Sequence, residues 1–229
     1  MNGGGVEKFW VELGARTDHL AQRLYEFNVL PARNAHPSFL TRFVADRAVL
    51  NALRTIDAPM RILSERLRAD PLPPPCWDFS DSRLQLAAMP QSALERLLAY
   101  VGSAICRNRI AHEIGGRSIR ELDERFGCDL YSFAVKRAPI IVGRKEPLPY
   151  PVEAAGLAES ILATGRRTFE ACFRDAPDGF LARFELLFPS DWKWEWRRIV
   201  EQPTTDAAWR LIIRIATREV DQNSLGCFV

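Results

Sequence analysis

The sequence has few of the residues and patterns that mark a catalytic or metal-binding site. It contains three histidines, and none of its five cysteines belongs to a Cys-x-x-Cys pair. The cysteines are far apart, at Cys76, Cys106, Cys128, Cys172 and Cys227. An odd number of widely spaced cysteines argues against a disulfide framework or a zinc site and favours reduced, mostly buried thiols in a cytosolic protein.

Long apolar runs and an excess of one charge are also missing. No segment approaches the ~20 apolar residues of a membrane-spanning helix, and the N-terminus lacks the pattern of a secretory signal. We therefore expect a soluble protein without direct membrane insertion. The 31 Lys and Arg residues against 29 Asp and Glu give a net charge of only +2, which disfavours a nucleic-acid binder and indicates protein partners.

Two short segments resemble catalytic motifs but lack an essential residue. His112-Glu113 begins like a zinc-protease helix, yet Gly116 stands where the second histidine is required. Around Ser118 the sequence resembles a nucleophile elbow, but Arg120 replaces its final glycine. Glycine-rich phosphate-binding loops do not occur. We predict no catalytic residue, no cofactor and no metal ligand.

The apolar residues recur mainly at helical spacing, which predicts an all-α fold with little or no sheet. Ser38, Ser92 and Ser118 are the expected helix N-caps. Pro59 is expected to kink or divide a helix, and the β-prone run 140–142 is the one candidate strand. The expected helices cover 6–27, 39–44, 49–67, 94–110, 118–126, 130–138, 158–173, 180–188 and 209–220.

The predicted domain organisation is one irregular helical domain over 6–229, preceded by a flexible tail at 1–5. Two Pro-containing segments, 70–79 and 139–151, are candidate linkers between sub-lobes. The proline run at 71–75 is an ordered crossing, a semi-rigid spacer or a polyproline ligand for a partner.

Trp192, Trp194 and Trp196 form the candidate protein interface. On a helix, Trp194 would point away from the other two, whereas in an extended segment all three would share a face. Exposed aromatic residues are favoured anchors of protein interfaces. Three tryptophans that each cover a different edge of one core explain the pattern equally well.

The helical pair at 118–138 invites comparison with a DNA-binding helix-turn-helix, whose second helix needs basic residues for phosphate contact. The segment 107–129 instead balances five arginines against five acidic residues. The positive residues are Arg107, Arg109, Arg117, Arg120 and Arg125, and the negative ones are Glu113, Glu121, Asp123, Glu124 and Asp129. A packed helical hairpin is the preferred interpretation, and a DNA-binding regulator is the leading alternative function. An unrecognised helical enzyme is the second alternative.

Two blocks of the sequence carry a family resemblance. The first spans 27–40 and contains Phe27, Asn28, Pro31, His36, Ser38 and Leu40. The second runs from Gly115-Gly116 to Gly127 and continues through Leu130, Phe133-Ala134 and Ala138. Together they resemble the SctK family (YscK, PscK, OrgA and MxiK), the small adaptors of type III secretion injectisomes.

The resemblance implies a non-enzymatic component of the sorting platform, located in the cytoplasm at the bacterial inner membrane. It would join the cytoplasmic domain of the inner-membrane ring protein SctD to the SctQ pod protein, and through SctQ it would connect to SctL and the SctN ATPase. Asn28 and His36 belong to the first block, and we expect them to be structural residues.

Overall fold

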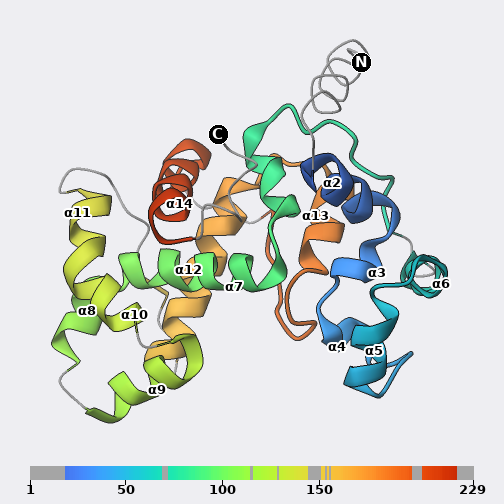
Figure 1. Cartoon of the computed structure of the whole chain (residues 1–229). Helices are drawn as coiled ribbons and strands as arrows, with labels where there is room; N and C mark the ends of the chain where they lie inside the picture. The colour runs from blue at the N-terminus through green and yellow to red at the C-terminus, as the bar shows by residue number, and fades with distance from the viewer. Residues whose placement is uncertain are drawn as a thin grey trace. The chain divides into compact units, whose positions relative to one another are not determined.

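Helices account for the regular structure throughout the residues that this computed structural model describes, which are 19–68, 72–113, 116–127, 129–143, 151–152, 154, 156–197 and 203–220 (Figure 1). No strand occurs among them, so the all-α prediction is confirmed there. None of the helices in these ranges is long and apolar enough to cross a membrane. The predicted tail at 1–5 and the start of the first predicted helix lie outside the described residues.

The chain divides into two compact units. Unit 1 contains Met1–Gln91 and Asp175–Lys193, and unit 2 contains Ser92–Arg174 and Trp194–Leu225. The segment 72–79 therefore lies inside unit 1, and the described part of 139–151 lies inside unit 2. The interpretation of 6–229 as a single domain, with linkers at these two segments, stays a prediction.

Unit 1 is built from short helices. In chain order they are α2 (His19–Val29), α3 (Pro31–Asn34), α4 (Pro37–Leu40), α5 (Arg47–Leu53), α6 (Asp57–Arg68), the 3-10 helix η1 (Ser82–Ala88) and α13 (Asp178–Glu185). Asp46 begins α5 by accepting hydrogen bonds from the backbone N–H groups of Ala48 and Val49. Its carboxylate thus provides an acceptor for two of the donors that a helix start leaves unpaired.

A chain of aromatic rings forms the core of unit 1. Phe27 from α2 contacts Phe79 at 6.2 Å and Phe180 at 5.5 Å between ring centroids. The series continues through Phe184 to Phe188. A second apolar cluster lies beneath α3 to α6 and consists of Ala32, Ala35, Leu40, Leu50, Met60, Leu63, Leu67 and Leu186.

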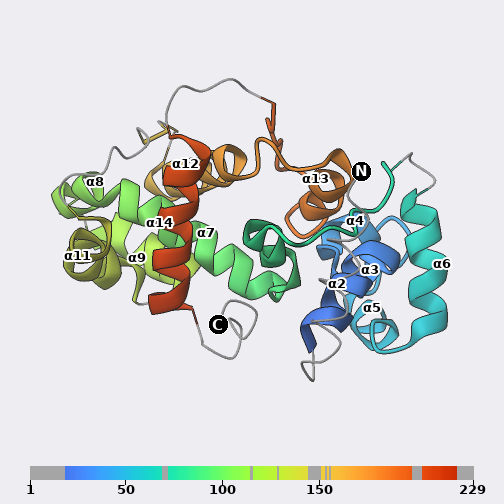
Figure 2. The same cartoon turned by 90° about the horizontal axis from the view of Figure 1, so that it is seen from above.

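Unit 2 contains the longest helices of the described chain. Its elements are α7 (Gln91–Ile105, beginning at the unit boundary), α8 (Arg107–His112), α9 (Gly116–Phe126), α10 (Leu130–Ser132), the π-helix η2 (Phe133–Arg137), α11 (Ala138–Val142), α12 (Leu157–Cys172) and α14 (Thr205–Glu219). Helix α12 packs on α9 and α14 (Figure 2).

Two glycines allow α7 and α12 to touch backbone to backbone. A Cβ atom added at Gly102 would collide with the carbonyl oxygen of Ile161, and one added at Gly165 would collide with that of Leu98. Gly127 ends α9 at φ 98°, a backbone conformation that residues with side chains rarely adopt. Helix α9 therefore ends at Phe126, which is the end expected for the helix at 118–126.

The expected helix boundaries are wrong in several places. His36, not Ser38, is the N-cap residue of α4. Helices α7 and α9 begin before Ser92 and Ser118, which lie inside them. The break in the predicted 49–67 helix falls at 54–56, and Pro59 lies in the first turn of α6, where a missing N–H costs little.

The candidate strand at 140–142 is also wrong, because these residues belong to α11. Pro139 lies at the start of that helix and does not end the preceding one. Its fixed φ angle suits the first turn of a helix, and this outweighs the β preference of Ile140, Ile141 and Val142.

Candidate functional site

The first signature block forms the bend between α2 and α4, and α3 lies within it. Phe27 and Leu40 are almost fully buried, with exposed fractions of 1% and 0%. Pro31 begins α3 and is buried. The segment between the helices expected at 6–27 and 39–44 therefore contains a helical turn of its own.

The polar residues of the block connect distant parts of unit 1. Asn28 Nδ2 donates to the carbonyl oxygen of Cys76 at 2.5 Å, while the carbonyl oxygen of Asn28 accepts from Arg183 Nε at 3.4 Å. His36 Nδ1 accepts from the backbone N–H of Ser38 at 3.2 Å. Ser38 Oγ in turn accepts from the N–H of Ser190 at 2.9 Å. These contacts support a structural role for Asn28, His36 and Ser38.

The tryptophan segment has no regular secondary structure over 192–195. Within unit 1, Trp192 stacks on Phe188 at 5.6 Å and is partly exposed. Within unit 2, Trp194 stacks on Trp196 at 4.5 Å with their planes 6° apart. Trp196 is 7% exposed and meets Phe173 edge to face. Trp196 is thus a core residue, and Trp192 and Trp194 stay predicted interface residues.

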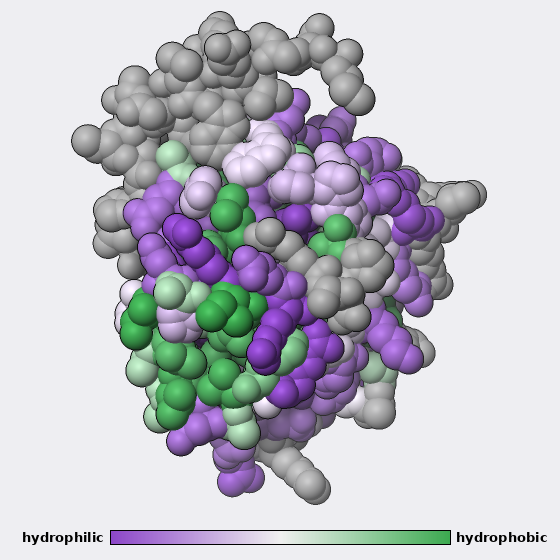
Figure 3. All heavy atoms as spheres, turned by 90° about the vertical axis from the view of Figure 1, so that its right-hand side faces the viewer, coloured by the Kyte–Doolittle hydropathy of each residue, from purple (hydrophilic) through white to green (hydrophobic). Residues whose placement is uncertain are grey.

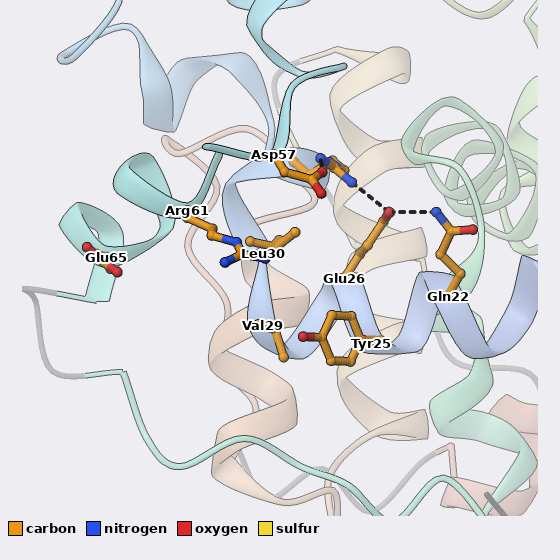
Figure 4. A pocket seen from close by; sticks show the side chains of 9 residues that line it. Gln22, Tyr25, Glu26, Val29, Leu30, Asp57, Arg61 and Glu65 are labelled. Carbon is orange, nitrogen blue, oxygen red and sulfur yellow. Dashed lines mark hydrogen bonds and ion pairs between the residues drawn. The ribbon is translucent and has the colours of Figure 1, made fainter. Parts of the chain in front are cut away.

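A pocket of about 440 Å³ opens between α2 and α6 in unit 1, and sequence reasoning missed it (Figure 4). Tyr25, Val29 and Leu30 supply its apolar lining, and Arg61 and Glu65 line it from α6. Tyr25 is 49% exposed and its ring lies 6.5 Å from that of Trp77. No signal in the sequence links the two helices, because the pocket depends on tertiary packing.

An ion-pair network occupies one wall of this pocket. Arg33 Nη1 contacts Glu26 Oε1 at 2.8 Å, and Arg33 also pairs with Asp57. The hydrogen bond from Arg33, together with its charge, lowers the pKa of the Asp57 carboxyl. Gln22 donates to the same Glu26 oxygen at 3.1 Å. Arg33 is thus engaged by two carboxylates and holds α3 against α6.

A second polar network lies in unit 2. Tyr100 donates to Asp129 Oδ2, and Arg96 contacts the same oxygen at 3.1 Å. Burial, followed by the hydrogen bond to Asp129, raises the pKa of Tyr100 to about 12. Arg137 Nη2 lies 3.5 Å from Asp129 Oδ2 and 3.0 Å from Glu219 Oε2, so it links the two carboxylates. Burial raises the pKa of Glu219.

Neither network gathers the residues of a metal site. In the part of the chain that the structure describes, no group of three or more His, Cys, Asp or Glu side chains is placed to hold a metal ion. The buried thiols of Cys76 and Cys106 have raised pKa values, with burial as the main cause, which reduces their nucleophilicity at neutral pH.

These features describe an all-α protein with an ordered N-terminal bend, a partly exposed tryptophan segment and a polar pocket. Residues 22–226 match the model of the family described as YOP proteins translocation protein K (YscK). The chain therefore belongs to the YscK family, and the family resemblance seen at 27–40 and 115–138 is confirmed.

A solved structure supports the fold. The chain is similar to the cytoplasmic domain of PscK from P. aeruginosa, described as a protein of the type III secretion sorting platform. The two share 22% sequence identity with a TM-score of 0.55, and the similarity covers 88% of this chain and 96% of the chain in that structure. No curated protein matches the sequence.

Proposed function

We propose that the protein is a non-enzymatic cytoplasmic adaptor of the type III secretion sorting platform. It acts at the base of the injectisome, peripheral to the bacterial inner membrane. It links the cytoplasmic domain of the SctD ring protein to the SctQ pod protein, and through SctQ to SctL and the SctN ATPase. The observation that carries this proposal is the match of residues 22–226 to the YscK family.

The chemistry of such a role is reversible protein docking. Repeated modest contacts around a ring gain effective concentration, so stable assembly does not require each contact to be tight. The part-exposed side chains of Trp192 and Trp194 are candidate contacts, because aromatic residues often anchor protein interfaces. A cofactor is not needed for any part of this role.

The proposal is tested by deletion and by direct binding. Deletion should abolish secretion while transcription of the secretion genes continues, and the purified protein should bind the cognate SctQ and the SctD cytoplasmic domain. Intact secretion after deletion, or binding to neither partner, would lead us to withdraw the proposal.

The tryptophans are tested separately. Trp194→Ala should weaken partner binding with little change in stability, whereas Trp196→Ala should destabilise the fold because Trp196 is buried. Unchanged binding by both Trp192→Ala and Trp194→Ala would place the docking surface elsewhere.

A further inference from the structure

The side of unit 1 that carries α4 and α5 leaves apolar side chains uncovered. Val49 is 48% exposed and Ile56 is 51% exposed. Leu53 lies one helical turn after Val49 on α5. Phe39, Phe43 and Val44 are only partly buried on the second apolar cluster. These six residues are called the α4–α5 face. Figure 3 shows hydrophobic residues gathered on the side of the molecule that carries these helices.

The charge around the α4–α5 face is mostly positive. Between residues 39 and 57 the chain has Arg42, Arg47 and Arg54 against the acidic residues Asp46 and Asp57, and Asp57 already pairs with Arg33. The Asp46 carboxylate already accepts two backbone N–H groups at the start of α5. The guanidinium of Arg42 lies over the Phe43 ring, 4.7 Å from its centroid. Arginine therefore borders the apolar surface directly.

The two remaining arginines lie close enough to affect each other. Burial lowers the pKa of Arg54, and the charge of Arg47 lowers it further. Arg54 donates to the carbonyl oxygen of Ala35, a neutral acceptor. A carboxylate placed between Arg47 and Arg54 would relieve their repulsion and make charge-assisted hydrogen bonds.

We infer that the α4–α5 face is a docking surface for an acidic amphipathic segment of a partner protein. The partner's apolar side chains would cover Val49, Leu53 and Ile56, and its carboxylates would pair with the bordering arginines. An uncovered apolar patch with a polar border is typical of a protein-interaction site. Arginine and aromatic residues are also enriched in such interfaces.

Two other occupants fit the surface less well. An isologous contact between two copies would place the same arginines opposite one another. An anionic membrane is typically bound by clusters of about four to eight basic residues, whereas this border has three arginines and an intervening aspartate. The inference rests on the proposed function in one respect, because the acidic segment would belong to SctQ or to the SctD cytoplasmic domain.

The test compares charge-introducing variants with matched controls. Val49→Glu, Ile56→Glu and Arg47→Glu alter the face. Ile140→Glu and Arg210→Glu alter an isoleucine and an arginine that are exposed in unit 2. Thermal unfolding should stay close to wild type for all five, since surface changes seldom exceed ~0.5 kcal/mol.

Binding of the full-length protein to SctQ and to the SctD cytoplasmic domain is measured for each variant. The inference expects the three face variants to lose at least about tenfold in affinity for one partner, which corresponds to 1.4 kcal/mol. The controls should bind like wild type. Equal binding by wild type and the face variants would overturn the inference and leave the proposed function standing.

A second probe distinguishes failure of the surface inference from failure of the proposed function. It is a synthetic helical peptide of about five turns with a leucine stripe and glutamates elsewhere, together with a lysine version of the same peptide. If wild type binds neither protein partner, the proposed function fails. The surface inference then stands only if wild type prefers the glutamate peptide and Val49→Glu abolishes that preference.

The rival occupants give different results. In one, wild type pellets with phosphatidylserine-containing vesicles and Arg47→Glu does not, while both bind the protein partners equally. That result would replace the inference with membrane binding. A dimer in sedimentation that Val49→Glu dissociates, again with partner binding unchanged, would replace it with self-association.

Discussion

At the scale of single residues, the signature block of 27–40 shows how one short sequence positions several helices. Phe27 and Leu40 fill the two apolar clusters of unit 1. Asn28 reaches the 72–79 segment, and Ser38 reaches the loop after α13. The side chains of Asn28, His36 and Ser38 each satisfy a backbone group, which is costly to leave unpaired when buried.

Replacing Phe27 by Ala should destabilise the protein by about 3 to 5 kcal/mol. The side chain is 1% exposed and contacts Phe79 and Phe180, so its removal leaves a cavity among rings that cannot easily close it. Chemical denaturation measures the change. Tyr25→Ala, at a position 49% exposed on the same helix, is the control. A loss below ~0.5 kcal/mol for Phe27→Ala would reject its assignment to the core.

At the scale of elements, the contact between α7 and α12 depends on two glycines. Gly102→Ala should destabilise the protein by about 1 to 3 kcal/mol, because the new methyl group must push apart two helix backbones. Gly116→Ala is the matched control, since a Cβ there meets nothing within 4 Å. Thermal unfolding of both variants checks the prediction. Equal stability of Gly102→Ala and wild type would show that the helices separate at little cost.

The Tyr100–Asp129 pair predicts a pH dependence of unit 2. The folded-state pKa of Tyr100 is about 12, above its ordinary value of 10.0, so the folded protein binds this proton more tightly than the unfolded chain does. Its contribution to stability is complete below pH 10 and is lost as the pH rises towards 12. Denaturation measured from pH 9 to 12 should show that the free energy of unfolding falls less steeply with pH in Tyr100→Phe than in wild type. Parallel curves would contradict this prediction.

The elements also show what the sequence could predict. Helix α12 was expected within one residue of its observed bounds, and α14 was expected from 209 although it begins at Thr205. Both have apolar stripes that repeat over about four turns. The caps were not predictable in this way. The Ser38 hydroxyl contacts the chain 152 residues away, and Ser118 donates to Glu113 from inside α9. A serine's tertiary partner leaves no periodic signal in the sequence.

The candidate surfaces were predictable only in part. The tryptophan pattern indicated an aromatic segment, and its helical alternative does not occur, because 192–195 have no regular secondary structure. Trp196 is buried against Phe173, whereas Trp192 stacks on Phe188 and stays partly exposed. No local sequence pattern connects these phenylalanines to the tryptophans. The α4–α5 face could not be distinguished from core by its sequence, because partial burial at Phe39 and Phe43 and full burial at Leu40 have the same hydrophobic signature.

At the scale of the whole molecule, charge balance predicts the absence of specific DNA binding. The net charge is +2, and the helices from α8 to α10 mix arginines with acidic residues. Asp129 is held by Arg96 and Arg137, and Glu159 by Arg125 at 2.6 Å. Those arginines are already paired with carboxylates, so phosphate contacts would have to displace them.

We therefore expect no sequence-selective retention of DNA by the purified protein at physiological salt. Weak retention at low salt that disappears steeply as salt is added would reflect only nonspecific attraction. A gel-shift measurement with a genomic fragment library, repeated at two salt concentrations, checks this expectation. Selective retention of one fragment, reduced by Arg120→Glu on α9 but not by Arg210→Glu on α14, would identify the helical pair as a DNA reader and favour a regulatory protein over an adaptor.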